Sequence, residues 1–296
     1  MIEIRDLTKS YDDICAVNHV TFTIPEGVMY GLLGTNGAGK TSLLRMLAGI
    51  VEPDSGEILF DGEIAGENPA YKENVFYLSD TPYYFPNASM EEMARFYARQ
   101  YPNEDIEGVH HLAEQLELDV RRPIRTFSKG MKRQAFLILA LCANTKYILC
   151  DEVFDGLDPL VTETMKDRLK QEMEARNLTV VVASHKLQEL EDICHHIGIL
   201  HKGGLLGAGE MKEQMTEVRK YQCVFSEEQS WETQEQYLRE HLNIVRCKKD
   251  GYFITLTVRG EAETAIRKMH PVFCHEVPMS LEEIFLAEME VESYDA

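Results

Sequence analysis

The sequence has no apolar segment long enough to cross a membrane. Its longest uninterrupted apolar run covers nine residues, 135–143, whereas a spanning helix needs about 20. The opening stretch, MIEIRDLTKSYDD, carries charges where a secretory signal would need an apolar stretch. The sequence therefore predicts neither a transmembrane helix nor a signal peptide.

Cysteine pairs and positive charges are also few. None of the seven cysteines forms a CxxC pair, which argues against a disulfide framework and favours free thiols in a reducing compartment. Lys and Arg number 30 against 50 Asp and Glu, which gives a net charge of −20. This balance disfavours nucleic acid and anionic lipid as partners, because both bind clustered cations. The net charge does not exclude binding of a small anion in a specially built pocket.

The composition supports a folded protein of one or two domains. Hydrophobic residues make up 44% of the 296 residues, which is enough for a sizeable core. Residues 1–209 alternate β-branched runs with helical patterns, which predicts an α/β unit with buried strands. Its first strands are expected at 2–4 and 20–24, and a helical subdomain at about 82–142. A linker with the domain boundary is expected at 205–215.

Residues 216–296 follow a different pattern, which predicts a small C-terminal α+β domain. Strand and helix patterns alternate here in the order β-α-β-β-α-β, as in ferredoxin-like folds. Lys249, Asp250 and Gly251 form the expected hairpin turn between the two middle strands. A last helix is expected at 280–289, with Ser280 as its N-cap.

Residues 34–41 match the phosphate-binding pattern GxxxxGK[ST]. An apolar strand precedes this P-loop and a helical segment follows it, which is the context that the motif needs and which argues against a chance Gly-rich turn. Backbone N–H groups would point at the phosphates of a nucleotide, Lys40 would reach the β- and γ-phosphates, and the Thr41 hydroxyl would hold Mg²⁺. The loop alone does not distinguish kinases, GTPases and ATPases. The predicted nucleotide-binding residues of the loop are Gly34, Thr35, Asn36, Gly37, Ala38, Gly39, Lys40, Thr41 and Ser42.

Two adjacent acids follow the apolar strand at 147–150. Asp151 at the strand end is placed to bind Mg²⁺, as a Walker B aspartate does. Glu152 is placed to orient an attacking water or to accept its proton. Taken alone, the pair is equally typical of a solvated turn.

Three further segments complete a series of motifs. A helix opens with Phe127-Ser-Lys-Gly-Met-Lys-Arg-Gln, Phe154-Asp-Gly-Leu-Asp-Pro follows the acid pair, and His185 follows a strand at 179–183. With the P-loop, they resemble the nucleotide-binding domain of ATP-binding-cassette (ABC) transporters, in particular bacterial export-type cassettes with a C-terminal extension. The resemblance covers residues 1–209 and implies an α/β P-loop NTPase fold, with a mixed-sheet core and a helical subdomain.

The resemblance also implies roles for residues outside the P-loop. Tyr11 would stack on adenine, although a surface tyrosine would have the same sequence context. Ser128 and Gly130 would contact ATP held by an opposite subunit, and Ser128 also suits a helix N-cap. Asp158 lies in a loop that crosses the dimer interface in the family. The implied catalytic residues are Lys40, Glu152 and His185, and the implied Mg²⁺ ligands are Thr41, Asp151 and Asp80.

The sequence departs from the usual family pattern at several of these motifs. Asp80 stands where the family usually has glutamine, which replaces an amide that can donate by a carboxylate that cannot. The signature motif contains Lys129, and Arg133-Gln134 reverses the usual order of those two residues. Val153 and Asp155 replace the frequent Pro and Ser. The P-loop lysine, the acid pair and the histidine are all retained.

The resemblance implies an ATPase subunit that acts with partners. A second cassette, in a homodimer or with a paired homologue, would complete the site. A separate transmembrane permease would hold the chain at the cytoplasmic face of the cell membrane. Tyr83, Tyr84 and Phe85 with Met90 and Met93 are the candidate permease surface, with core packing as the equal alternative.

Two other functions stay open on sequence alone. The first is a soluble ABC machine that acts on ribosomes or DNA. The absence of a second cassette or a long coiled coil, together with the net charge of −20, argues against it. The second is a regulatory or ligand-sensing switch in which the C-terminal domain reads a signal.

Overall fold

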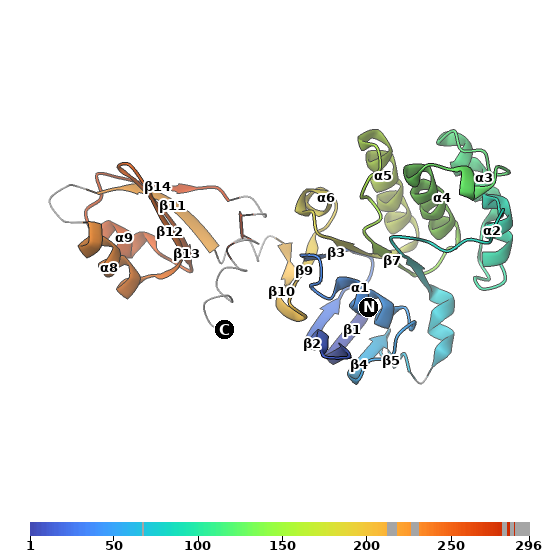
Figure 1. The fold of residues 1–296 in the computed structure, drawn as a ribbon, viewed down its shortest axis with the longest axis horizontal. Coiled ribbons are helices and arrows are strands. Elements are labelled where there is room, and N and C mark those ends of the chain that lie inside the picture. Colours follow the sequence, from blue (N-terminus) through green and yellow to red (C-terminus); the bar gives the residue numbers. More distant parts are fainter. Residues whose placement is uncertain (67, 212–217, 226–230, 280–282, 285–286, 288–296) are drawn as a thin grey trace. The chain divides into compact units, whose positions relative to one another are not determined.

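The computed structural model describes residues 1–66, 68–211, 218–225, 231–279, 283–284 and 287 (Figure 1). The contacts within the chain divide it into two compact units, Met1–Ala208 and Gly209–Ala296. Among the described residues, no helix combines the length and the apolar character needed to cross a bilayer.

An antiparallel sheet forms the N-terminal part of the first unit. Its strand order is β2-β1-β4-β5. The strands β1 and β2 extend well beyond the predicted 2–4 and 20–24. Register shifts after Ile4, Leu7 and Lys9 break the period-2 apolar pattern, which explains why the sequence indicates only the regular part of each strand. The bounds are β1 Ile2–Tyr11, β2 Ile14–Ile24, β4 Ser55–Phe60 and β5 Glu63–Ile64.

A second sheet, in the order β10-β9-β3-β8-β7-β6, forms the centre of the first unit. The neighbours from β9 to β6 pair in parallel. Every residue of β3, β7 and β8 is buried, which confirms the expected burial of these strands on both faces. The bounds are β3 Met29–Gly34, β6 Val75–Leu78, β7 Tyr147–Asp151, β8 Thr179–Ser184, β9 His196–His201 and β10 Gly204–Glu210.

The strands β9 and β10 are absent from the sequence prediction. Residues 205–210 of the segment expected as a linker belong to β10, which lies at the edge of the sheet and is only partly buried, and residues 212–215 lie outside the described residues. Its glycines and polar residues made it resemble a loop. Edge strands tolerate such residues, because one side of the strand makes no sheet hydrogen bonds.

The helices of the first unit cover the sheets in two groups. Helix α1 packs between the two sheets, and its leucines share one apolar core with residues of β1, β3 and β7. Helices α2, α3 and α4 lie together beside the central sheet, within the range expected for the helical subdomain (Figure 1). The bounds are α1 Lys40–Leu47, α2 Met90–Tyr97, α3 Ile106–Gln115, α4 Lys129–Cys142, α5 Pro159–Arg176 and α6 Leu187–Glu191, with short 3₁₀ helices at Pro69–Asn74 and Ile124–Thr126.

The second unit has the predicted β-α-β-β-α-β order. Its antiparallel sheet has the order β12-β13-β11-β14, which is the ferredoxin-like arrangement. Residues 280–282, 285–286 and 288–289 of the expected last helix lie outside the described residues. The bounds are β11 Val218–Val224, α8 Trp231–His241, β12 Asn243–Asp250, β13 Phe253–Arg259, α9 Glu263–Lys268 and β14 Phe273–Val277.

Candidate nucleotide-binding site

The central sheet brings the P-loop, the acid pair, His185 and Asp80 to one edge. In a parallel sheet, the carboxyl ends of neighbouring strands lie side by side. Strand β3 ends at the P-loop, β7 ends at Asp151, and β8, which pairs with both of them, leads into His185. Asp80 follows β6 at the same edge and is exposed. Motifs far apart in the sequence thus converge through the strand order.

The P-loop folds around its own lysine. Lys40 opens helix α1, and its side chain is only 5% exposed. Its Nζ donates hydrogen bonds to the carbonyl oxygens of Gly34, at 2.7 Å, and of Thr35, at 3.1 Å. Burial lowers the pKa of Lys40, and the charges of Glu152 and Asp151 oppose that shift. The loop therefore holds a desolvated cation that can exchange its carbonyl partners for phosphate oxygens.

Glycine is favoured at positions 37 and 39 of the loop for different physical reasons. Gly39 has φ of +101°, and a Cβ there would lie 2.1 Å from the carbonyl oxygen of Ala16 in β2. Gly37 has φ of +83° and no atom within 4 Å of its Cβ position. Because residues 35–37 are exposed, the tip of the loop presents open backbone to an incoming ligand.

Asp151 is buried, and one of its two carboxylate oxygens has no hydrogen-bond partner. Its Oδ2 accepts a hydrogen bond from the Tyr77 hydroxyl at 3.3 Å, whereas Oδ1 is buried without a hydrogen-bond partner. Burial raises the pKa of Asp151, a hydrogen bond from Thr41 lowers it, and the nearby charge of Asp80 raises it again. A buried carboxylate oxygen beside a hydroxyl, with a second carboxylate close by, suits a hard cation such as Mg²⁺.

Tyr77 is a site residue that the sequence analysis missed. It lies on β6, one position before the strand ends, and it contacts Asp151 on β7. Burial raises the pKa of Tyr77 to about 12, so the hydroxyl stays a neutral donor to the carboxylate. A tyrosine near the end of the strand that neighbours an acidic strand end is the pattern that could have revealed it.

Glu152 and His185 meet directly. His185 Nδ1 lies 3.0 Å from Glu152 Oε1, and Lys40 Nζ lies 3.9 Å from the same oxygen. Glu152 has φ of +51°, and its backbone N–H donates to the Ala183 carbonyl oxygen at 2.9 Å. The turn after β7 thus aims this carboxylate toward the P-loop and toward β8. The three residues expected to be catalytic lie together.

Tyr11 and the signature residues come from elements outside the central sheet. Tyr11 ends β1, is 40% exposed, and has Lys9 Nζ 5.7 Å from its ring centre. Ser128 is the N-cap of α4, and its side chain accepts a hydrogen bond from the Met131 N–H at 3.2 Å. Gly130 follows in the first turn of α4. Among the described residues, no hydrogen bond or ion pair joins Ser128 to the P-loop.

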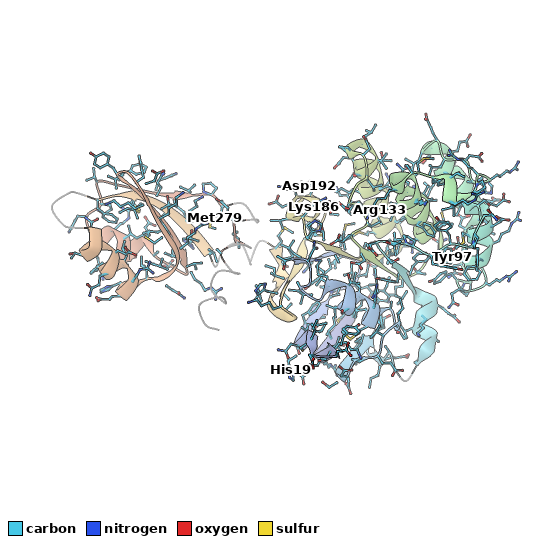
Figure 2. The ribbon with its side chains drawn as sticks, in the orientation of Figure 1. His19, Tyr97, Arg133, Lys186, Asp192 and Met279 are labelled. Carbon is cyan, nitrogen blue, oxygen red and sulfur yellow. The ribbon has the colours of Figure 1, made fainter. Side chains whose placement is uncertain are left out.

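Asp155 forms an ion-pair cluster that the sequence analysis did not anticipate. Its carboxylate oxygens lie 2.6 Å from Lys186 Nζ, 3.4 Å from Arg133 Nη1 and 3.7 Å from Lys129 Nζ. Arg133 comes from α4 and Lys186 from the segment after His185 (Figure 2). The hydrogen bond from Lys186, with the neighbouring cations, lowers the pKa of Asp155. Three of the departures from the family pattern are therefore one interacting group.

Asp155→Asn tests this cluster through stability. The side chain of Arg133 is only 6% exposed, so removing the nearby negative charge leaves a buried cation poorly compensated. We expect a loss of about 1–3 kcal/mol, seen in calorimetry as a fall of roughly 2–8 °C in the unfolding temperature of the first unit.

The matched control for this substitution is Asp167→Asn. Asp167 lies 3.9 Å from Lys170, and its side chain is 65% exposed. Because exposed pairs contribute little, we expect a change below about 0.5 kcal/mol. Equal unfolding temperatures for the Asp155 and Asp167 variants would contradict the cluster's stabilising role.

The fold and the site together define a P-loop NTPase, in which a phosphate-binding loop, an acid pair and a histidine lie at one sheet edge. A family model described as ABC transporter matches residues 17–155. The ABC transporter ATP-binding protein YtrB of Bacillus subtilis (strain 168) is 31% identical over 97% of each chain. The chain therefore belongs to the ABC transporter family, which confirms the resemblance and the cassette fold.

Two further relatives agree with this assignment. The bacitracin transport ATP-binding protein BcrA of Bacillus licheniformis is 34% identical over 70% of this chain and 68% of its own. A solved structure described as an ATP-binding subunit of an ABC transporter superposes with a TM-score of 0.67 and 28% identity, covering 72% of this chain and 91% of that one. The chain is an ATP-binding subunit of a transport system, and the prediction of a transport function over a regulatory switch is confirmed.

Proposed function

We propose that this chain hydrolyses ATP as one of a pair of cassettes and so drives a separate membrane permease. The observation that carries the proposal is the convergence of Lys40, Glu152 and His185 at one sheet edge. Glu152 Oε1 lies 3.0 Å from His185 Nδ1 and 3.9 Å from Lys40 Nζ. A cation, a candidate base and a histidine within contact distance are the parts that phosphoryl transfer to water needs.

The nucleotide would be held along the same edge. Tyr11 would stack on the adenine, and the backbone N–H groups of residues 34–42 would surround the phosphates. Thr41, Asp151 and Asp80 would hold Mg²⁺, which fits the unpartnered Asp151 Oδ1. When bound, Mg²⁺ would neutralise part of the charge on the β- and γ-phosphates.

The hydrolytic residues would exchange partners when ATP binds. Lys40 would leave the carbonyl oxygens of Gly34 and Thr35 for phosphate oxygens, which are stronger acceptors. Glu152 would then orient the attacking water and accept its proton. His185, released from Glu152, would donate to the γ-phosphate and stabilise the charge that develops there.

The second half of the site would come from another chain. Each chain has one P-loop, and Ser128 and Gly130 lie at the start of α4, where the Ser128 side chain accepts a hydrogen bond from the Met131 N–H. Signature residues that face a partner's γ-phosphate would make ATP part of the interface, and Asp158 would lie in the loop that crosses it. Loss of that phosphate on hydrolysis would release the pair, which is a two-state motion. The partner is a second copy or a paired homologue.

An aromatic patch on the first unit supports permease docking. Tyr83, Phe85 and Phe96 are 72%, 42% and 44% exposed, and their rings contact one another in series at 5.6 and 5.0 Å. Exposed clusters of this kind are typical of interaction surfaces. Met90 and Met93 of the candidate surface are buried in the core, so for these two residues the packing alternative holds. Docking here would keep the chain at the cytoplasmic face of the membrane.

Phe96→Glu tests the docking proposal. A charge placed in a buried aromatic contact weakens the binding free energy by about 2 kcal/mol or more. We therefore expect roughly 30-fold weaker membrane association. The measurement is the share of full-length chain in the membrane fraction of its native cell, with ATP binding measured in parallel. Ile50→Glu is the control, because Ile50 is 60% exposed outside the patch.

Two outcomes of this experiment would contradict two different claims. A wild-type chain that is never found with membranes would contradict the permease proposal itself. A Phe96→Glu chain that stays at the membrane as the wild type does would contradict only the assignment of the patch.

A further inference from the structure

One face of the sheet in the second unit forms an apolar core with the helices, whereas the two central strands carry polar side chains on the other face. Side chains alternate across β11 and β13, and Tyr221, Cys223, Ile254, Leu256 and Val258 all belong to the core that includes Leu238 of α8 and Ile266 of α9. The intervening residues of these strands therefore face away from the two helices. This second side is called the open face, and Val218 at one end of it packs against Ile284 and Ala287.

The open face carries two rows of polar side chains across three strands. In the first row Arg246 of β12 pairs with Thr257 of β13, which pairs with Lys220 of β11. In the second row, Lys248 pairs with Thr255, which pairs with Gln222. Paired residues point to the same side of a sheet, so three cations, two hydroxyls and one amide lie on the same surface.

These two rows form the floor of a pocket. Its volume is about 380 Å³, within the range of small-molecule sites. Val277 and Met279 line one side, so an apolar wall stands next to the polar floor (Met279 is labelled in Figure 2). Thr257 is only 7% exposed although it is polar, as expected for a residue at the bottom of a pocket.

Charge is distributed unevenly in this unit. Residues 210–296 contain ten Lys and Arg against eighteen Asp and Glu. Three of the ten cations line the pocket, whereas Glu283 is its one acidic lining residue among those described. Glu283 Oε1 lies 2.6 Å from Lys220 Nζ, so one cation of this face already pairs with a carboxylate.

We propose that this pocket binds a small organic anion. Its carboxylate or phosphate would lie over Lys220, Arg246 and Lys248 and accept hydrogen bonds from the hydroxyls of Thr255 and Thr257. A short apolar part would contact Val277 and Met279. No aromatic side chain lines the pocket among the described residues, so the site offers no surface on which a nucleic-acid base could stack.

The test is calorimetric titration of the full-length chain with citrate and, separately, inorganic phosphate. We expect one site per chain for at least one of the two anions, and the tighter of them identifies the preferred group. The double variant Arg246→Gln/Lys248→Gln should weaken binding at least about tenfold, because two charge-assisted hydrogen bonds are lost.

Two variants control for charge and for the P-loop. Arg267→Gln/Lys268→Gln removes the same charge from exposed positions of α9 and should leave the affinity within about twofold. Lys40→Met disables the P-loop and should leave citrate or phosphate binding at this site intact. ATP binding should be unchanged in both double variants.

Three results would overturn the proposal. The first is absence of binding of either anion up to about 10 mM. The second is equal affinity in the wild type and Arg246→Gln/Lys248→Gln. The third is loss of anion binding in Lys40→Met, which would place the anion in the P-loop. None of these results bears on ATP hydrolysis, so the two proposals fail separately.

Discussion

Glu152→Gln is expected to lower ATP turnover by about two to four orders of magnitude while ATP still binds. The amide keeps the shape of the side chain and its reach toward His185, but it no longer accepts a proton from water. The measurement is steady-state phosphate release at saturating ATP, with equilibrium ATP binding in the same preparation.

Stalled hydrolysis should also change the assembly state. If ATP bridges two cassettes, the Glu152→Gln chain should form an ATP-dependent dimer that light scattering detects, whereas the wild type should not accumulate one. Glu191→Gln, an exposed substitution at the end of α6, is the control. Equal turnover in the wild type and Glu152→Gln would refute the role assigned to Glu152.

Lys40→Met should weaken ATP binding by roughly two orders of magnitude. The substitution keeps most of the buried stem but removes the ammonium group, which is worth about 2–4 kcal/mol to a desolvated phosphate contact. Calorimetric titration with ATP in the presence of Mg²⁺ measures the change.

A second lysine provides a close control for that experiment. Lys72 also donates to a backbone carbonyl oxygen, that of Gly49 at 2.9 Å, but it is exposed and lies outside the site. Lys72→Met should bind ATP as the wild type does. If Lys40→Met also retained wild-type affinity, the backbone of the loop alone would account for phosphate binding.

The parts of the site that are contiguous in sequence were predictable. The P-loop is a strand, a turn and a helix in succession, and the acid pair follows a buried strand directly, so period and composition locate both. The joint role of Glu152, His185 and Lys40 was implied only by the resemblance to ABC cassettes, and the structure brings them together because parallel strands end at one sheet edge. The ferredoxin-like order of the second unit also followed from regular alternation of patterns.

What the sequence did not reveal depends on register and on long-range contacts. Asp155 meets Lys129, Arg133 and Lys186 across 22 to 31 positions of sequence, and only the placement of α4 and β8 brings them together. The full length of β1 was hidden, because its bulges shift the side chains out of phase with the apolar period. Tyr77 was missed because its hydrogen-bond partner, Asp151, lies on another strand, 74 positions away in the sequence.

Gly37 and Gly39 of the P-loop are under different structural constraints, so their replacement or retention in a homologue of this chain would mean different things. A methyl group at position 39 would clash with the Ala16 carbonyl oxygen whether or not a ligand is present. Retention of Gly39 therefore shows only that β2 still lies against the loop. Position 37 opens onto empty space, and asparagine tolerates its left-handed backbone. A homologue that has lost ATPase activity would be free to replace residue 37 while it keeps glycine at position 39. The presence of Gly39 alone would therefore not prove activity.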